Sequence, residues 1–154
     1  MCALARTTPS TFILMGGDGF HHCGSVRPSQ YLPLPDQVSP SPFSSPPHLH
    51  GTICPGALLQ AIHPKNSRTE PYYGHFAEAE GRNVAEAEAT LGKLKVFDAR
   101  DDVLVIIAHD KSLLDVIDVF PKGANEWKQK GWKVTGRWRF LEDFKEAAAK
   151  SNAA

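Results

Sequence analysis

Two apolar segments of the sequence each end in a residue type that commonly binds divalent metal ions. Residues 12–15 are followed by two glycines and Asp18, and residues 103–108 are followed by His109. Short aliphatic runs bounded by glycine or charged residues are typical of strands that are buried on both faces. Because functional side chains collect where rigid strands end in loops, we expect Asp18 and His109 to converge on one ion.

Two further imidazoles follow Asp18 closely, at His21 and His22. Carboxylate oxygen and imidazole nitrogen are donors that zinc binds, and the flanking glycines allow the backbone to bend sharply. The alternative is that Asp18 caps a turn and both histidines are solvated. His109 has an alternative too, as a buried histidine satisfied by a backbone carbonyl, with Asp110 either orienting it or capping the next helix.

Other polar clusters favour a structural interpretation. His48, His50 and Cys54 lie among prolines, whereas structural zinc needs four preset ligands, so we do not expect a metal there. The polar and aromatic residues of 63–75 are interpreted as loop packing. Three tryptophans interleaved with lysines suggest base stacking, but their spacing favours a place in the core: Trp127, Trp132 and Trp138.

Composition limits the class of protein. The chain has 154 residues, 42% of them hydrophobic, which predicts one domain over 1–154. Seventeen basic and seventeen acidic residues give no net charge, so we expect neither a nucleic-acid nor a membrane partner. Three cysteines are too few for a disulfide framework, and no apolar stretch is long enough to span a bilayer. We therefore expect a cytoplasmic protein.

The remaining pattern predicts an α/β chain. A hairpin is expected from 1–8 and 11–15, then a Pro-rich loop over 28–57 and a short helix over 58–62. Asn83 and Glu86 form a capping pattern before an amphipathic helix over 84–97. Ser112 is the expected cap of a short helix through Asp118. Further helical turns are expected over 125–130 and 137–150, with a frayed tail over 151–154.

Two stretches together resemble the metallo-β-lactamase superfamily, in its lactonase-like hydrolase branch. They are Phe-Ile-Leu-Met-Gly-Gly-Asp-Gly-Phe-His-His-Cys-Gly-Ser-Val-Arg-Pro at 12–28 and Val-Ile-Ile-Ala-His-Asp at 105–110. Residues 27–33 and 130–140 resemble one subgroup of that branch. The resemblance implies an αββα sandwich with two zinc ions, in which Asp18 bridges both ions and His109 binds one. In such a site a metal-bound hydroxide attacks the carbonyl of a lactone or ester.

The chain also departs from that family. The signature His-x-His-x-Asp-His is absent from the sequence, and so is the Gly-His segment that precedes a strand resembling residues 2–6. The chain thus resembles the C-terminal half of the fold, with Met1 just downstream of a missing histidine. Many relatives place a tyrosine that assists the leaving group three residues after the aspartate. His21 holds that position here and is the candidate catalytic residue.

Three interpretations follow. In the first, the chain is a truncated or remnant member of a zinc-dependent hydrolase family that cleaves lactones or esters, and it has little activity alone because most metal ligands are missing. In the second, it is a small metal-binding protein in which His21, His22 or His48 replaces the missing ligands. In the third, it is a metal-free interaction module that pairs with itself or another chain through an uncovered sheet face.

Overall fold

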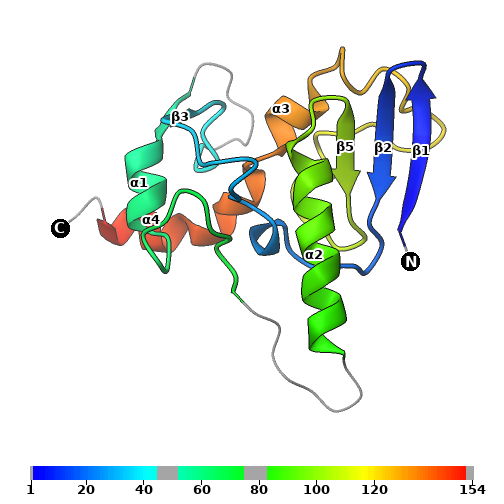
Figure 1. The fold of residues 1–154 in the computed structure, drawn as a ribbon. Helices are drawn as coiled ribbons and strands as arrows, with labels where there is room; N and C mark the ends of the chain where they lie inside the picture. The colour runs from blue at the N-terminus through cyan, green and yellow to red at the C-terminus, as the bar shows by residue number, and fades with distance from the viewer. Residues whose placement is uncertain (1, 45–51, 75–82, 152–154) are drawn as a thin grey trace.

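The computed structural model describes residues 2–44, 52–74 and 83–151 and has an α/β architecture (Figure 1). The strands are β1 (Ala3–Thr8), β2 (Thr11–Met15), β3 (Gln37–Val38), β4 (Cys54–Pro55) and β5 (Val103–Ile106). The α-helices are α1 (Gly56–Ala61), α2 (Val84–Ala99), α3 (Trp132–Gly136) and α4 (Lys145–Ser151). Three 3-10 helices lie between them, at Cys23–Ser25, Lys111–Leu113 and Arg139–Phe144. The predicted α/β class is confirmed.

The main sheet has the order β1-β2-β5 and mixes both pairing directions. β1 and β2 form the predicted antiparallel hairpin, whose turn is braced by hydrogen bonds between the Thr11 hydroxyl and the hydroxyls of Thr7 and Thr8. β2 and β5 run parallel, and their register pairs Met15 with Ile106. Parallel strands end at the same edge of a sheet, so this pairing brings distant parts of the sequence together.

Alternate residues of β2 and β5 point to opposite faces of the sheet and enter two hydrophobic clusters. On one face, Leu14 and Val105 belong to the larger cluster, together with Leu91 and Leu94 of α2. On the other face, Ile13 and Leu104 pack with Trp127 and Trp132, while Trp138 joins the larger cluster. The predicted core role of the tryptophans is confirmed, and both faces of β2 and β5 are covered.

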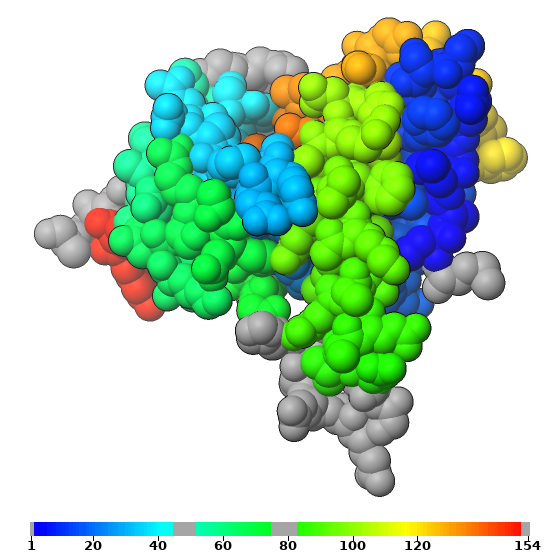
Figure 2. Space-filling view, viewed as in Figure 1, coloured from blue at the N-terminus to red at the C-terminus, as the bar shows by residue number. Residues whose placement is uncertain are grey.

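The capped helix is α2, which extends two residues beyond its predicted end. The Asn83 side chain accepts a hydrogen bond from the Glu86 backbone N–H, as an N-cap does, and its side-chain amide donates another to the Glu86 carboxylate. Figure 2 shows one side of α2 at the molecular surface. Val96 and Phe97 of this helix are exposed. None of the helices in the described part of the chain is both long and apolar enough to cross a lipid bilayer.

The Pro-rich segment is more ordered than predicted for 28–57. β3 and β4 pair antiparallel inside it, and α1 begins at Gly56, before the end of the predicted loop. The Gly56 N–H donates to the Asp36 carbonyl at 2.7 Å, and a Cβ on Gly56 would lie 2.0 Å from the Pro35 carbonyl oxygen. Only glycine therefore fits this approach. Proline blocks long regular strands, but it still allows a pairing of two residues on each side, such as that of β3 with β4.

The C-terminal third differs from the prediction at three points. Asp110, not Ser112, caps the helix that follows β5, because its carboxylate accepts the Ser112 N–H. Residues 125–130 form turns rather than a helix, while α3 begins at Trp132. The predicted helix over 137–150 is divided into a 3-10 helix and α4. Ser151 ends α4, and the rest of the predicted frayed tail lies outside the described residues.

Candidate metal centre

The pairing of β2 with β5 places Asp18 opposite His109. Met15 and Ile106 are paired, and each of the two polar residues follows its strand's paired residue by three positions. The ladder continues past the strands, because the Gly16 N–H donates to the Ile106 carbonyl at 2.8 Å and the Ala108 N–H donates to the Gly17 carbonyl at 3.1 Å. Gly17 has a φ of 52°, a left-handed conformation that favours glycine.

Asp18, His21 and His109 lie together at this edge of the sheet. The His109 Nε2 atom lies 2.9 Å from Asp18 Oδ1, and the His21 Nε2 atom lies 3.7 Å from the same oxygen. The two imidazole rings meet edge to face, with their centroids 4.9 Å apart. One ligand atom from each residue lies within 4.8 Å of the other two. The structure thus brings together all three residues that the sequence singled out, and their roles toward a metal remain a prediction.

The chemistry of this donor set fits one divalent ion. A carboxylate and two imidazoles are the protein ligands of one common type of catalytic zinc site, which keeps a further position open. All three side chains are exposed, by 71% for Asp18, 69% for His21 and 60% for His109, so an ion has access from solvent. Within the described ranges no other group of three such residues is close enough to form a second site.

His22 does not join this cluster, although it is next to His21. Its Nδ1 accepts the Gly24 N–H at 2.9 Å, and its Nε2 lies 2.9 Å from an Asp143 carboxylate oxygen. Both ring nitrogens therefore have partners within the protein. His48, the other proposed replacement ligand, and His50 lie outside the described residues. His63 is buried and bonded to loop backbone, as loop packing predicts.

A cavity of about 390 Å³ opens beside the candidate centre. His21 and His109 line it, and Phe140 and Leu114 supply apolar surface. The cavity wall is braced by the ion pair between Arg139 and Asp115, whose closest atoms are 3.2 Å apart. The 3-10 helix Arg139–Phe144 was not expected near the strand ends, because its side chains carry no motif that marks them in the sequence.

Asp110 connects the two loops that carry the histidines. It accepts a hydrogen bond from the buried Cys23 thiol at 3.1 Å, while its other oxygen accepts from the Ser112 N–H at 3.1 Å. Burial raises the pKa of the Cys23 thiol, so this group stays protonated and donates. The sequence pointed to Asp110 as a residue that orients His109 or caps a helix, and gave no sign of the contact with Cys23.

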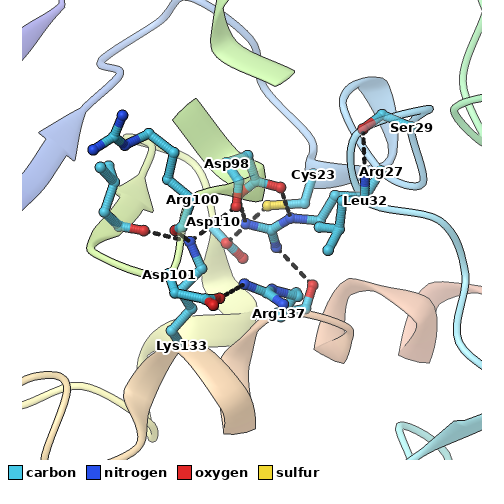
Figure 3. Close-up of polar contacts among 11 residues, drawn as sticks. Cys23, Arg27, Ser29, Leu32, Asp98, Arg100, Asp101, Asp110, Lys133 and Arg137 are labelled. Carbon is cyan, nitrogen blue, oxygen red and sulfur yellow. Dashed lines mark hydrogen bonds and ion pairs between the residues drawn. The ribbon is translucent and has the colours of Figure 1, made fainter. Parts of the chain in front are cut away.

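A buried ionic cluster joins the loop after Cys23 to α2 and α3 (Figure 3). Arg27 donates two hydrogen bonds to the Asp98 carboxylate, at 2.7 and 2.6 Å, and a third to the Arg137 carbonyl. Burial alone would raise the pKa of Asp98, but the Arg27 charge and hydrogen bonds hold it below its ordinary value. Lys133 donates to the carbonyls of Asp98, Arg100 and Val103.

Similar proteins are found among curated sequences. The chain is 41% identical over 152 residues to gamma-lactamase FDB1 of Fusarium pseudograminearum (strain CS3096), which covers 94% of this chain and 35% of that protein. It is 42% identical over 150 residues to metallo-hydrolase mfmC of Annulohypoxylon moriforme, covering 96% of this chain and 37% of the relative. A gamma-lactamase of Gibberella moniliformis (strain M3125 / FGSC 7600), MBL2, is 42% identical over 97 residues, 61% of this chain and 39% of the relative. No family model and no solved structure matches the chain.

The matched region is therefore nearly all of this chain but only a little over a third of each of these relatives. The relatives bear the names of a metallo-hydrolase and of gamma-lactamases, which agree with the family that residues 12–28 and 105–110 resemble. Over nearly its whole length, the chain is thus homologous to one segment of relatives that belong to the metallo-β-lactamase family.

Proposed function

We propose that this chain carries part of the zinc site of a hydrolase that cleaves lactones, esters or, as two relatives' names suggest, gamma-lactams. The observation that carries the proposal is the convergence of Asp18, His21 and His109 at the carboxyl ends of two parallel strands. The similarity to a protein named as a metallo-hydrolase supports the same chemistry. A bound zinc ion would supply polarisation of a carbonyl group and activation of water.

Each side chain has a defined part in this proposal. Asp18 offers a carboxylate oxygen to which both imidazoles point, so it is the central ligand. His109 is the second ligand, held opposite Asp18 by the β2–β5 register. His21 lies where it either completes the ligand set or gives a proton to a leaving group, and its Nε2 is the atom that faces Asp18. The 390 Å³ cavity beside them has room for the substrate.

We further propose that the chain corresponds to the C-terminal half of an αββα sandwich. The three-stranded sheet covered by α2 supports this, as does the match to a little over a third of the length of each relative. Three described ligands suit one ion, whereas a two-ion site needs ligands from elsewhere. We therefore expect one tightly held zinc at most and weak hydrolysis by these 154 residues.

The experiment is a hydrolysis assay of the purified chain with added zinc, against a lactone, an ester and a gamma-lactam. Parallel reactions contain Asp18→Ala, or Asp36→Ala as a control, since Asp36 is an exposed carboxylate whose partner is Arg68. The proposal predicts slow, zinc-dependent turnover that Asp18→Ala abolishes and Asp36→Ala leaves unchanged. Zinc-independent turnover, or turnover that Asp18→Ala retains, would contradict it.

A second candidate is an interaction module without turnover, favoured by the outer edge of the sheet. β1 pairs with β2 on one side only among the described residues, and Leu4 is half exposed on it. An unpaired edge strand is a template for pairing with another chain. Native mass spectrometry tests this: a stable dimer or a complex supports it, and a monomer at micromolar concentration contradicts it.

We also propose that the protein works in the cytoplasm. All three cysteines, Cys2, Cys23 and Cys54, are free thiols, which supports a reducing compartment. Imaging of a fluorescent fusion tests this location, and a secreted product would contradict it.

A further inference from the structure

The three residues of the candidate centre lie on two loops that follow β2 and β5, and their own side chains are exposed. The ladder beyond β2 and β5 fixes the backbone at Gly17 and Ala108. His21 lies four residues past Gly17, beyond the last of these ladder contacts. Something other than the sheet must therefore hold the loop of His21 against the loop of His109.

A hydrogen bond between Cys23 and Asp110 joins these loops (Figure 3). Cys23 is two residues after His21, and Asp110 follows His109 directly, although the two partners are 87 residues apart in sequence. The Cys23 residue is only 4% exposed, in contrast to the exposed histidines. The link is thus a part-buried contact beside an open site, and both of its residues line the cavity.

Both ends of this contact are anchored. Asp110 is held on its other oxygen by the Ser112 N–H and by the Ser112 hydroxyl at 2.5 Å. The Cys23 carbonyl accepts the N–H groups of Val26 and Arg27, and Arg27 is itself fixed in the buried ion pair. The hydrogen bond from the Cys23 thiol to the Asp110 carboxylate therefore connects the buried interior to the loop that carries His109.

We propose that Cys23 and Asp110 are positioning residues that hold His21 and His109 at the separation needed to share one metal ion with Asp18. This rests on the proposed function. A helix cap alone explains the contacts of Asp110 with Ser112, but it does not explain a thiol from the opposite loop. Residues that orient metal ligands typically change metal affinity by about 10-fold to 100-fold when they are removed.

The test compares Cys23→Ala and Cys23→Ser with Cys54→Ala, which removes another buried thiol distant from the centre in sequence. Zinc affinity is measured by calorimetry, the Co(II) complex by its visible spectrum, and the free energy of unfolding by urea titration. We expect Cys23→Ala to weaken zinc binding at least about 10-fold and to alter the Co(II) spectrum. Cys23→Ser, which keeps a donor, restores both, and Cys54→Ala changes stability alone.

Unchanged affinity in Cys23→Ala, or an equal loss in Cys54→Ala, would overturn the proposal. If the unmodified chain binds neither metal, the proposed function fails. The positioning role is then tested on the metal-free protein by the distance between the two imidazole rings. Nuclear Overhauser contacts between the rings of His21 and His109, 4.9 Å apart, are expected in the unmodified chain and in Cys23→Ser but not in Cys23→Ala. Their persistence in Cys23→Ala refutes the positioning role.

Discussion

Arg27 and Asp98 form a two-point ion pair in the interior, with Nε and Nη2 of the guanidinium each donating to one carboxylate oxygen. The side chains are 6% and 2% exposed. The pair joins the loop that continues from the candidate centre to the end of α2, and it lies beside Lys133 and Arg137 of the α3 region. It is therefore a buried polar link between the site loop and the helices.

Removing one partner of this pair should destabilise the fold strongly. Arg27→Met leaves a buried carboxylate without its main partner, and Asp98→Leu leaves a buried guanidinium. We expect each to lower the free energy of unfolding by about 3–5 kcal/mol. The double variant should lose less than the sum of the two single losses, because neither charge is then left alone.

Urea denaturation of the two single variants and the double variant measures this coupling. Lys65→Met is the matched control, since its ion pair with Glu70 is more than half exposed on both sides, and it should change stability little. Additive losses in the double variant would show that the two charges do not support each other.

Lys133 should make stability depend on pH in the alkaline range. Burial lowers its pKa to about 8 in the folded protein, below the ordinary value of 10.5. Between these values the unfolded chain binds more protons than the folded one, so the free energy of unfolding should rise with pH. The full gain is about 3 kcal/mol from this group alone.

The measurement is urea denaturation at intervals from pH 7 to pH 10.5, for the unmodified chain and Lys133→Met. The free energy of unfolding of the unmodified chain, minus that of Lys133→Met, should increase as pH rises. Comparing the two chains cancels the opposite contribution of Cys23, whose raised pKa removes stability above pH 9. A pH-independent difference would show that Lys133 titrates normally.

Much of the main sheet could be predicted from residue patterns, because its signals are local. The aliphatic runs became β2 and β5, and Asn83 with Glu86 became the cap of α2. The small elements in the Pro-rich segment could not be predicted in this way. β3 has only two residues, and its partner β4 lies 15 residues or more away, so no local periodicity marks either one.

Two glycines should respond oppositely to alanine. At Gly56 the added Cβ would lie 2.0 Å from the Pro35 carbonyl oxygen, so Gly56→Ala should cost about 2 kcal/mol or more. At Gly92, inside α2, nothing lies within 4 Å of the added carbon, so Gly92→Ala should stabilise the chain by about 1 kcal/mol. Thermal unfolding monitored by circular dichroism checks both, and a stabilising Gly56→Ala would contradict the observed contact.

The candidate site was predictable in its strand-end residues and not in its supports. Asp18 and His109 each follow an apolar run, and the parallel register then places them together. The Cys23–Asp110 contact and the pairing of His22 with Asp143 depend on how distant loops fold against each other. Neither residue pair has a spacing that marks it, so the sequence alone could not rank His21 above His22 as a replacement metal ligand.

The most direct test of the central claim is the zinc content of the purified chain after dialysis against zinc, measured by elemental analysis. The unmodified chain and Asp36→Ala should each retain one zinc per chain, and the double variant Asp18→Ala, His109→Ala should retain none. An absence of bound zinc in the unmodified chain, or equal zinc in the double variant, would contradict the account.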